Sequence, residues 1–246
     1  MDITRNDRIR MERAHVHAWP ALRTERIDGW LWRSSGGGSK RANSVSTVDF
    51  TGTDVGVAIA AVETRYSALG AEVRFQTFDE SGPAGLPDAL RARGYTDASP
   101  TVTMFRRQDG LPVPDGVEIR DAVWDEWLEV YLEAITENRR EMNQVILRHI
   151  PAPKAFFGYR RGGRIIATAL CVVSNGCAVI ECVATRLENR QQGAARAVLA
   201  GLLDWATRQD ADWVGLQAVA DNAPAIRLYE SLGFVRGSTN WYWTKP

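Results

Sequence analysis

Residues 183–206 read VATRLENRQQGAARAVLAGLLDWA, a pattern that predicts the end of a strand, a short loop and an amphipathic helix. The small residues Gly193, Ala194 and Ala195 lie where the loop becomes the helix, so backbone N–H groups there can approach a ligand closely. The first turn of a helix favours phosphate because it carries unpaired N–H donors and the positive end of the dipole. Arg190 and Arg196 add positive charge on either side. The stretch alone allows two interpretations, an ordinary strand-to-helix connection or an anion-binding loop.

The composition is that of a globular protein with a substantial core, since 45% of the 246 residues are hydrophobic and 24% are charged. The length suits two domains of about 120 residues each. The formal net charge is zero, so nothing favours nucleic acid or an anionic membrane as a partner. We expect neither a signal peptide nor a membrane span, because the first 15 residues are charged and no apolar run approaches the required length of about 20 residues.

The cysteines and histidines give no indication of a metal site. The three cysteines share an apolar, strand-like setting without metal-ligand spacing: Cys171, Cys177 and Cys182. We expect them to be reduced core residues, which favours a cytoplasmic location. His15 and His17 are two residues apart in an expected helix and point in different directions, and His149 is alone. We interpret all three as ordinary surface histidines.

The chain divides at residues 108–116, QDGLPVPDG, whose prolines and glycines indicate a linker between residues 1–110 and 111–246. The first part is expected to contain a helix at 5–19, a strand at 26–33 and a glycine-rich hairpin turn at 34–40. The second part reads as one strand, two helices, three strands, and then helix and strand in alternation. This order is typical of a mixed α/β sheet.

The two parts resemble each other in sequence. Residues 75–78 (FQTF) align with residues 216–219 (LQAV), and counting back the same 24 residues from each glutamine reaches Gly52 and Gly193. Such a repeat suggests a duplicated domain. The position of Arg190 is Asp49 in the first copy, and that of Ala195 is Asp54. Two carboxylates suit a helix N-terminus but would repel a diphosphate, so we expect the ligand site in the second half.

A second group of polar residues follows in the second half. Asn222 and Pro224 stand at the start of a predicted helix, where Asn222 can cap the helix and proline is tolerated. Tyr229 follows Asn222 by about two turns, so the two side chains can share a face. Core packing would explain a tyrosine, but the aligned residue of the first half is Leu90. The hydroxyl therefore occurs only in the half that keeps the arginines, which favours a functional role.

Two motifs of the second half match a known family. Residues 190–195 (RQQGAA) resemble the Q/R-x-x-G-x-G/A signature of the GNAT superfamily of N-acetyltransferases, and residues 222–234 (NAPAIRLYESLGF) resemble its N-x-x-A-x-x-x-Y-x-x-x-G-F motif. Leu187 stands where the family commonly has proline. The resemblance implies an α/β (α+β) fold of two tandem GNAT-like domains, each a mixed, mostly antiparallel twisted sheet flanked by helices. Residues 1–110 would be a degenerate copy and residues 111–246 the N-acetyltransferase domain.

The resemblance also implies acetyl-CoA as cosubstrate. Its pyrophosphate would lie on the N–H groups of residues 191–196, its pantetheine arm would pair with the strand end at 183–185, and Tyr229 would protonate the leaving thiolate. The expected cofactor-binding residues are Val183, Ala184, Thr185, Arg190, Gln191, Gln192, Gly193, Ala194, Ala195, Arg196, Asn222 and Tyr229. No metal is expected.

The implied reaction transfers an acetyl group to a primary amine by direct attack in a ternary complex. The amine must be neutral, and a lysine-like amine has a pKa of about 10.4, so a base or a desolvating pocket must help. Glu181 is the first candidate for the base, because strand alternation places it in step with Val183 and Thr185. Glu137 and Glu141 are alternatives in the helical region that shapes the acceptor pocket of this family. The predicted catalytic residues are Tyr229 and Glu181.

Two further hypotheses stay open. A non-catalytic acyl-CoA sensor or interaction protein would explain the degenerate first copy. Alternatively, the first half recognises the acceptor, with Trp30, Trp32, Arg33 and Asn43 facing a groove between the halves. The sequence selects neither among amino acids, aminoglycosides, polyamines and protein lysines as acceptor, nor between a monomer and a homodimer.

Overall fold

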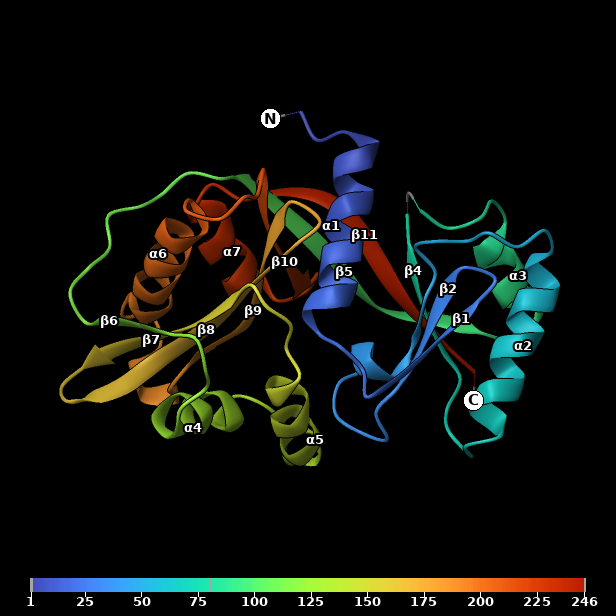
Figure 1. Cartoon of the computed structure of the whole chain (residues 1–246), viewed down its shortest axis with the longest axis horizontal. Helices are drawn as coiled ribbons and strands as arrows, with labels where there is room; N and C mark the ends of the chain where they lie inside the picture. The colour runs from blue at the N-terminus through green and yellow to red at the C-terminus, as the bar shows by residue number, and fades with distance from the viewer. Residues whose placement is uncertain (1, 80, 246) are drawn as a thin grey trace.

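The computed structural model describes residues 2–79 and 81–245 (Figure 1). Its helices are α1 (Arg5–Ala18), α2 (Val55–Ser67), α3 (Leu86–Ala92), α4 (Asp125–Glu133), α5 (Glu137–Arg148), α6 (Ala194–Ala206) and α7 (Ala223–Ser231), with 3-10 turns η1 (Arg41–Asn43) and η2 (Leu187–Asn189). Its strands are β1 (Arg23–Ile27), β2 (Trp30–Ser34), β3 (Val45–Ser46), β4 (Arg74–Phe78), β5 (Thr96–Arg107), β6 (Val117–Arg120), β7 (Lys154–Arg161), β8 (Arg164–Ser174), β9 (Cys177–Thr185), β10 (Trp213–Val219) and β11 (Val235–Thr244).

These strands form one mixed sheet of 11 strands in the order β1-β2-β3-β4-β11-β5-β10-β9-β8-β7-β6. Two neighbouring pairs are parallel, β3 with β4 and β9 with β10, and the other pairs are antiparallel. The expected α/β class and mixed, mostly antiparallel sheet are confirmed. The expectation of one sheet for each half is corrected, because the sheet runs without interruption through both halves (Figure 1).

The last strand of each half lies beside a strand of the other half. β5 comes from the first half and pairs with β10 of the second, whereas β11 ends the chain and pairs with β4 of the first. β5 and β11 also pair with each other, with register shifts at two positions. The linker at residues 108–116 therefore follows a central strand of the sheet. Dividing the chain at this linker would separate β5 from its neighbours β10 and β11.

Helices cover both faces of the strands of the second half. α6 and α7 pack on one face, where Leu199, Leu203 and Ile226 are buried with Ile180 of β9. α1, α4 and α5 pack on the other face, in a core that contains Met11, Trp127 and Ile146. α1 belongs to the first half in sequence but contacts β8, β9 and β10. The first half thus supplies one helix of the layer that covers this face.

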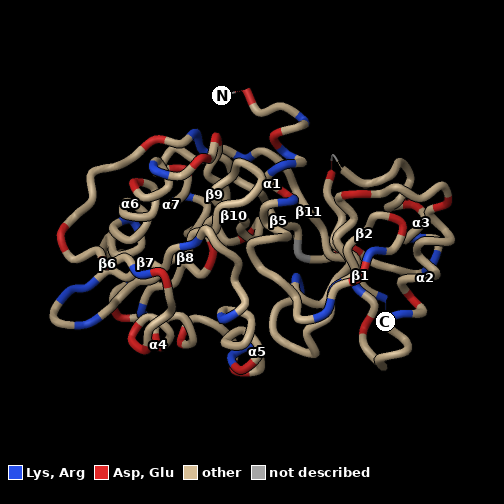
Figure 2. Tube along the Cα trace, viewed as in Figure 1, with Lys and Arg blue, Asp and Glu red and all other residues tan. Residues whose placement is uncertain are grey.

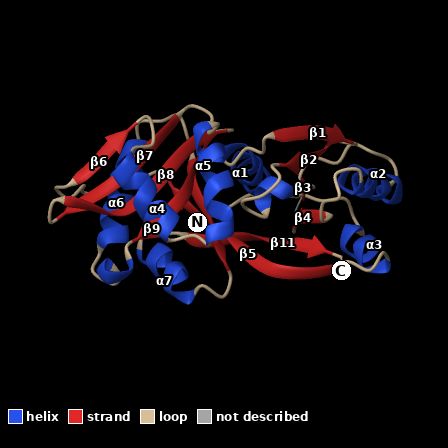
Figure 3. Cartoon of the chain, turned by 90° about the horizontal axis from the view of Figure 1, so that it is seen from below, coloured by secondary structure: helices blue, strands red, loops and turns tan. Residues whose placement is uncertain are grey.

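The strands β1–β4 have their own core beneath α2 and α3 (Figure 3). Trp30 and Trp32 are buried in it, so two of the residues expected to face an inter-domain groove instead face this core. Their alternation along β2 turns Leu31 and Arg33 to the opposite face, toward α1.

Two local predictions in the first half need comment. The helix at 5–19 is confirmed as α1, which Thr4 begins with a capping box and which ends before Pro20. The strand at 26–33 is wrong, because Asp28 and Gly29 have φ of 47° and 87° and make a tight turn between β1 and β2. The glycine-rich segment 34–40 is part of a longer connection from β2 to β3, and a Cβ on Gly38 would lie 2.8 Å from Asn143 Oδ1 of α5.

Basic and acidic residues are interspersed along the whole chain (Figure 2), as the equal numbers of the two kinds lead one to expect. Within residues 2–79 and 81–245, no helix combines the length and the apolar character that a membrane crossing requires.

Candidate active site

β9 and β10 are paired over only part of their length. The parallel ladder runs from Cys177 and Trp213 to Ile180 and Leu216, and within the described chain it goes no further. Cys182 has φ of 54°, and the register between β8 and β9 shifts beside it, which is the signature of a β-bulge. Residues 181–185 of β9 therefore present an edge without a strand partner on the side of β10.

The segment after β9 presents a run of free amides. Gln191 and Gly193 have φ of 58° and 80°, and this left-handed turn leads into α6. The N–H groups of residues 191–196 donate no hydrogen bond to any described part of the chain, and Ala197 N is the first to do so, to Gly193 O at 2.9 Å. Six consecutive donors at the positive end of a helix are an arrangement that suits an anion. A Cβ on Gly193 would meet no atom within 4 Å, so its backbone conformation, not space, requires glycine.

The polar side chains around these amides are exposed. Arg190 Nε donates to Thr185 O at 3.4 Å, and Arg196 Nη1 donates to Ser231 Oγ at 3.1 Å, at the end of α7. Ala194 is buried in the core under α6 and holds the start of the helix against the sheet. Two exposed guanidinium groups thus flank the free N–H groups and add positive charge beside them.

Asn222 caps α7, since its Oδ1 accepts a hydrogen bond from Ala225 N at 3.2 Å, with Pro224 in the first turn. The capping interpretation is therefore confirmed. Asn222 is exposed, so a second role as a cofactor contact stays a prediction.

Tyr229 lies in the core between α7 and the sheet, with its ring 6.1 Å from that of Phe234. Its side chain is 8% exposed, and its hydroxyl has no hydrogen-bond partner among the described residues. Burial, together with the negative charge of Glu181, raises the pKa of Tyr229 to about 12. Tyr229 is therefore a neutral phenol at physiological pH with a proton available to donate.

Glu181 forms a buried ion pair with the first half of the chain. Both of its carboxylate oxygens accept hydrogen bonds from Arg41 of η1, each at 2.7 Å. Burial raises the pKa of Glu181, but Arg41 and the neighbouring His15 outweigh it and bring the pKa to about 2. The bulge at Cys182 also reverses the alternation, so Val183 packs with the core of α6 and α7, whereas Glu181 faces α1 and η1. The expectation that Glu181 stays in step with Val183 is wrong for that reason.

His15 was expected at the surface, and this expectation is wrong. It is 1% exposed, its Nδ1 lies 3.6 Å from Glu181 Oε1, and neither ring nitrogen has a hydrogen-bond partner within the described chain. Its neighbour Glu12 is also buried and accepts hydrogen bonds from Thr103, Ser238 and Gln217. Met11, Ala14 and Ala18 mark an apolar helix face, and the spacing from Met11 to His15 puts the histidine on it, a signal that sequence reasoning passed over.

Of the other candidates, Glu137 and Glu141 are exposed on α5, and Asn43 is hydrogen-bonded within the first half. Asn43 fixes the glycine-rich segment, because its Nδ2 donates to Ser39 O at 3.0 Å and its Oδ1 accepts from Ser35 N at 2.9 Å. The segment that Asn43 shapes packs against α5, so the first half lines the side of the molecule from which Arg41 reaches Glu181.

A comparison with known proteins places this geometry in a family. The family model described as "Probable histone acetyltransferase Rv0428c C-terminal" matches residues 6–243. The chain is also 29% identical over 244 residues to the "Uncharacterized N-acetyltransferase YobR" of Bacillus subtilis (strain 168), covering 95% of this chain and 96% of that protein.

Solved structures share the fold. A GCN5-related N-acetyltransferase from Kribbella flavida superposes with a TM-score of 0.73 over 97% of this chain and 95% of that chain, at 18% identity. A tandem GNAT protein from the clavulanic acid biosynthesis pathway superposes with a TM-score of 0.55 over 77% of this chain and 69% of that chain, at 15% identity. The chain belongs to the Rv0428c C-terminal family and has the GNAT N-acetyltransferase fold.

Proposed function

We propose that the protein is an acetyl-CoA-dependent N-acetyltransferase that transfers the acetyl group to a primary amine by direct attack in a ternary complex. The run of six unbonded N–H groups at residues 191–196, next to the unpaired end of β9, carries this proposal. Six donors and a helix dipole fit a diphosphate, and a free strand edge fits an extended chain that contains amides. A diphosphate joined to such a chain is the chemistry of acetyl-CoA.

Tyr229 is the proposed acid. As the amine nitrogen bonds to the thioester carbon, the C–S bond breaks and the electron pair leaves on sulfur. Tyr229, with a pKa of about 12, holds a proton that it can give to this thiolate. Backbone N–H groups of residues 183–185 would stabilise the carbonyl oxygen while it carries negative charge.

Glu181 is the proposed proton acceptor, with one condition. While Arg41 binds both of its oxygens, the pKa of about 2 makes Glu181 a weak base. The role therefore requires the amine acceptor to approach Glu181 in place of Arg41. Until then, the ion pair holds the carboxylate in position and keeps it charged.

The chain arrangement supports a tandem origin with copies in residues 1–110 and 111–246. Each half contains one parallel strand pair followed by a helix, β3 and β4 with α3, and β9 and β10 with α7. In the first copy Asp54 caps α2 by accepting hydrogen bonds from Gly56 N at 2.7 Å and Val57 N at 3.1 Å. Two amides at the start of α2 are thus occupied by a carboxylate, which supports the interpretation that the first copy is degenerate.

Thermal unfolding with and without acetyl-CoA tests the cofactor. At a hundredfold excess over Kd, binding stabilises the folded chain by about 2.7 kcal/mol, which for this length raises Tm by about 5–10 °C. The control is S-acetylpantetheine, which carries the thioester and the pantetheine arm without the diphosphate and should give a much smaller shift. An unchanged Tm at millimolar acetyl-CoA would contradict the proposal.

A non-catalytic acyl-CoA sensor is the second candidate, and the occupied state of Glu181 favours it. Release of free thiol from acetyl-CoA, followed with spermidine, an aminoglycoside and a lysine-containing histone-tail peptide as acceptors, separates the two. Sustained release that depends on an amine excludes a pure sensor. Binding of acetyl-CoA without turnover on any acceptor would favour it.

A further inference from the structure

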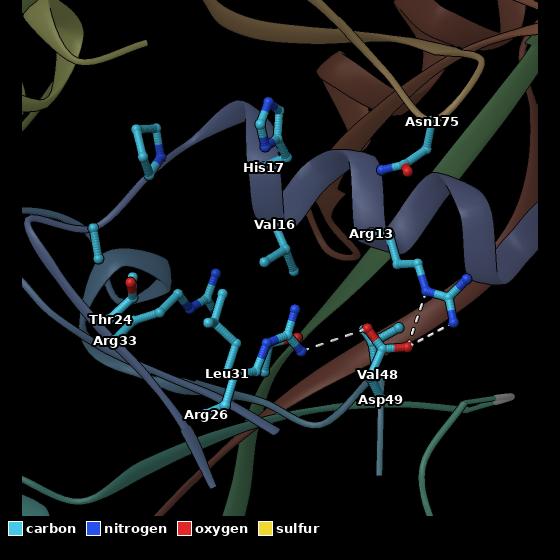
Figure 4. Close-up of a pocket in the computed structure, with 13 residues that line it drawn as sticks. Arg13, Val16, His17, Thr24, Arg26, Leu31, Arg33, Val48, Asp49 and Asn175 are labelled. Atoms are coloured by element: carbon cyan, nitrogen blue, oxygen red, sulfur yellow. Dashed lines mark hydrogen bonds and ion pairs between the residues drawn. The ribbon is translucent and has the colours of Figure 1, made fainter. Parts of the chain in front are cut away.

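A cavity of about 340 Å³ lies in the first half, between α1 and the strands β1, β2 and β3 (Figure 4). His17 and Val16 reach it from α1, Thr24 and Arg33 from the strands, and Asn175 from the hairpin between β8 and β9. Its volume is in the range of small-molecule sites. Its lining includes no residue of β10, α6 or α7, so it is separate from the proposed acetyl-CoA site.

The floor of this cavity carries a buried cation without a carboxylate. Arg33 is fully buried, and the partners of its guanidinium group are neutral: Nε donates to Ser44 O at 3.0 Å, and Nη2 donates to Ser44 Oγ at 3.0 Å and to Gln76 Oε1 at 2.8 Å. Nη1 has no hydrogen-bond partner in the described part of the chain. A buried guanidinium with an unused N–H donor is unfavourable unless an anion or other acceptor reaches it.

A second polar residue of the floor is Ser46, which lines the cavity together with Arg33 and is 3% exposed. The floor thus offers a ligand the unused Nη1 group of Arg33 and the hydroxyl of Ser46. Polar groups placed in this way are what fixes the orientation of a ligand in a pocket.

The arginines at the rim of the cavity are paired with a carboxylate, whereas the arginine on the floor is not. Asp49 accepts two hydrogen bonds from Arg13, at 2.9 and 2.7 Å, and lies 3.8 Å from Arg26, as the dashed lines in Figure 4 show. One carboxylate therefore serves two rim arginines, and Arg33 receives none. The cavity keeps an excess of positive charge and selects an anion.

Part of the remaining lining is apolar. Val16, Leu31 and Val48 face the cavity, and Val48 is buried. A fully hydrated inorganic anion would leave these side chains without a partner. A ligand with an anionic group for Arg33 and an apolar body for these side chains matches both parts.

We propose that this cavity is a binding site for a small organic carboxylate, with the carboxylate on Arg33 and Ser46 and the apolar body against Leu31 and Val48. A carboxylate can take two N–H bonds from a guanidinium, which makes the pair strong and directional. The proposal goes beyond acetyl transfer and assigns a ligand to the half that lacks the free amides of the proposed acetyl-CoA site.

Calorimetric titration with hexanoate and with its neutral isostere hexanamide tests the site. We expect hexanoate to bind the full-length protein at millimolar concentration, and hexanamide to bind at least about tenfold more weakly for want of the charge-assisted hydrogen bonds. Leu31→Trp should abolish binding by filling the cavity. Arg33→Met should weaken it by at least about tenfold. Arg23→Met, on β1 outside the cavity lining, is the matched control and should leave binding unchanged.

Leu31→Trp keeps the test valid if Arg33→Met fails to fold, because Leu31 is half-exposed and makes no buried polar contact. Equal affinity for hexanoate and hexanamide, binding that Leu31→Trp leaves intact, or binding of inorganic phosphate without hexanoate would each overturn the proposal. Acetyl-CoA is titrated into the wild-type protein separately. If acetyl-CoA does not bind, the proposed function is refuted, but the carboxylate site is not.

Discussion

The ion pair between Arg41 and Glu181 joins residues 140 positions apart, and Arg41→Met tests how much it stabilises the fold. The side chains are only 14% and 11% exposed, so solvent screens them little. The fall in the pKa of Glu181 from 4.5 to about 2 corresponds to about 3 kcal/mol of stabilisation of the charged form. Removing one partner of a buried pair typically costs about 3–5 kcal/mol, because the other charge remains buried and unpaired.

The pH dependence gives the prediction a sign. Because folding lowers the pKa of Glu181, its contribution to wild-type stability is complete above pH 4.5 and is lost as the pH falls toward about 2. In Arg41→Met, burial without Arg41 raises the pKa of Glu181, so the variant loses most stability at pH 7. The loss becomes smaller at lower pH, where Glu181 takes up a proton.

Urea unfolding at pH 7 and pH 5 measures both effects. Arg65→Met is the matched control, because its ion pair with Glu25 has exposed fractions of 54% and 41% and should contribute less than about 1 kcal/mol. The double variant Arg41→Met/Glu181→Gln should recover part of the loss, since no buried charge is left unpaired. A cost below about 1 kcal/mol for Arg41→Met, or no recovery in the double variant, would refute the reasoning.

Three further predictions concern the proposed site. Tyr229→Phe should lower turnover by about tenfold or more and leave acetyl-CoA affinity nearly unchanged. Because the pKa of Tyr229 is about 12, the wild-type rate should show no tyrosine-dependent decline up to about pH 11. Steady-state kinetics across pH check both expectations, and equal losses in turnover and affinity would make Tyr229 structural. Gly193→Ala should weaken acetyl-CoA binding by about tenfold, since an alanine at φ of 80° strains the loop by about 1 kcal/mol or moves its amides. The control Gly70→Ala, at φ of 59° with equal space around the new Cβ, should change stability alone. Calorimetric titration distinguishes the two variants, and an unchanged affinity in Gly193→Ala contradicts the anion site. Asp54→Ala should cost about 1 kcal/mol of stability through the lost cap of α2, without changing acetyl-CoA affinity. Thermal unfolding and titration measure the two quantities, and a change in affinity would place a ligand in the first copy.

Much of the fold could be predicted because its signals are local. α1, with its threonine cap and the proline that follows it, is readable from about 17 consecutive residues. The start of α6 is equally local, since Gly193 and two alanines fix the turn that leaves six amides unpaired. The resemblance to the GNAT family rested on two such local motifs, and the family model and the shared fold support it.

Two predictions of the direction in which a side chain points, for Glu181 and His15, were wrong. Glu181 and Val183 separated onto opposite faces because one residue, Cys182, adopts φ of 54° and inserts a bulge. His15 is buried because α1 packs on strands β8, β9 and β10 of the second half. The bulge leaves the local hydrophobic pattern unchanged, so that pattern alone could not locate Glu181, whereas the apolar face of α1 does include His15.

Local sequence specifies the helices, most strands, the free amides at the start of α6 and the contrast between Arg190 and Asp49, because hydrogen bonds and charges over a few neighbouring residues settle them. The crossing of β5 and β11 between the halves and the ion pair of Arg41 with Glu181 arise from long-range packing instead. These features depend on which distant segments pair with each other, and many different strand pairings would satisfy the local sequence patterns equally well. The packing of the whole sheet selects one of them.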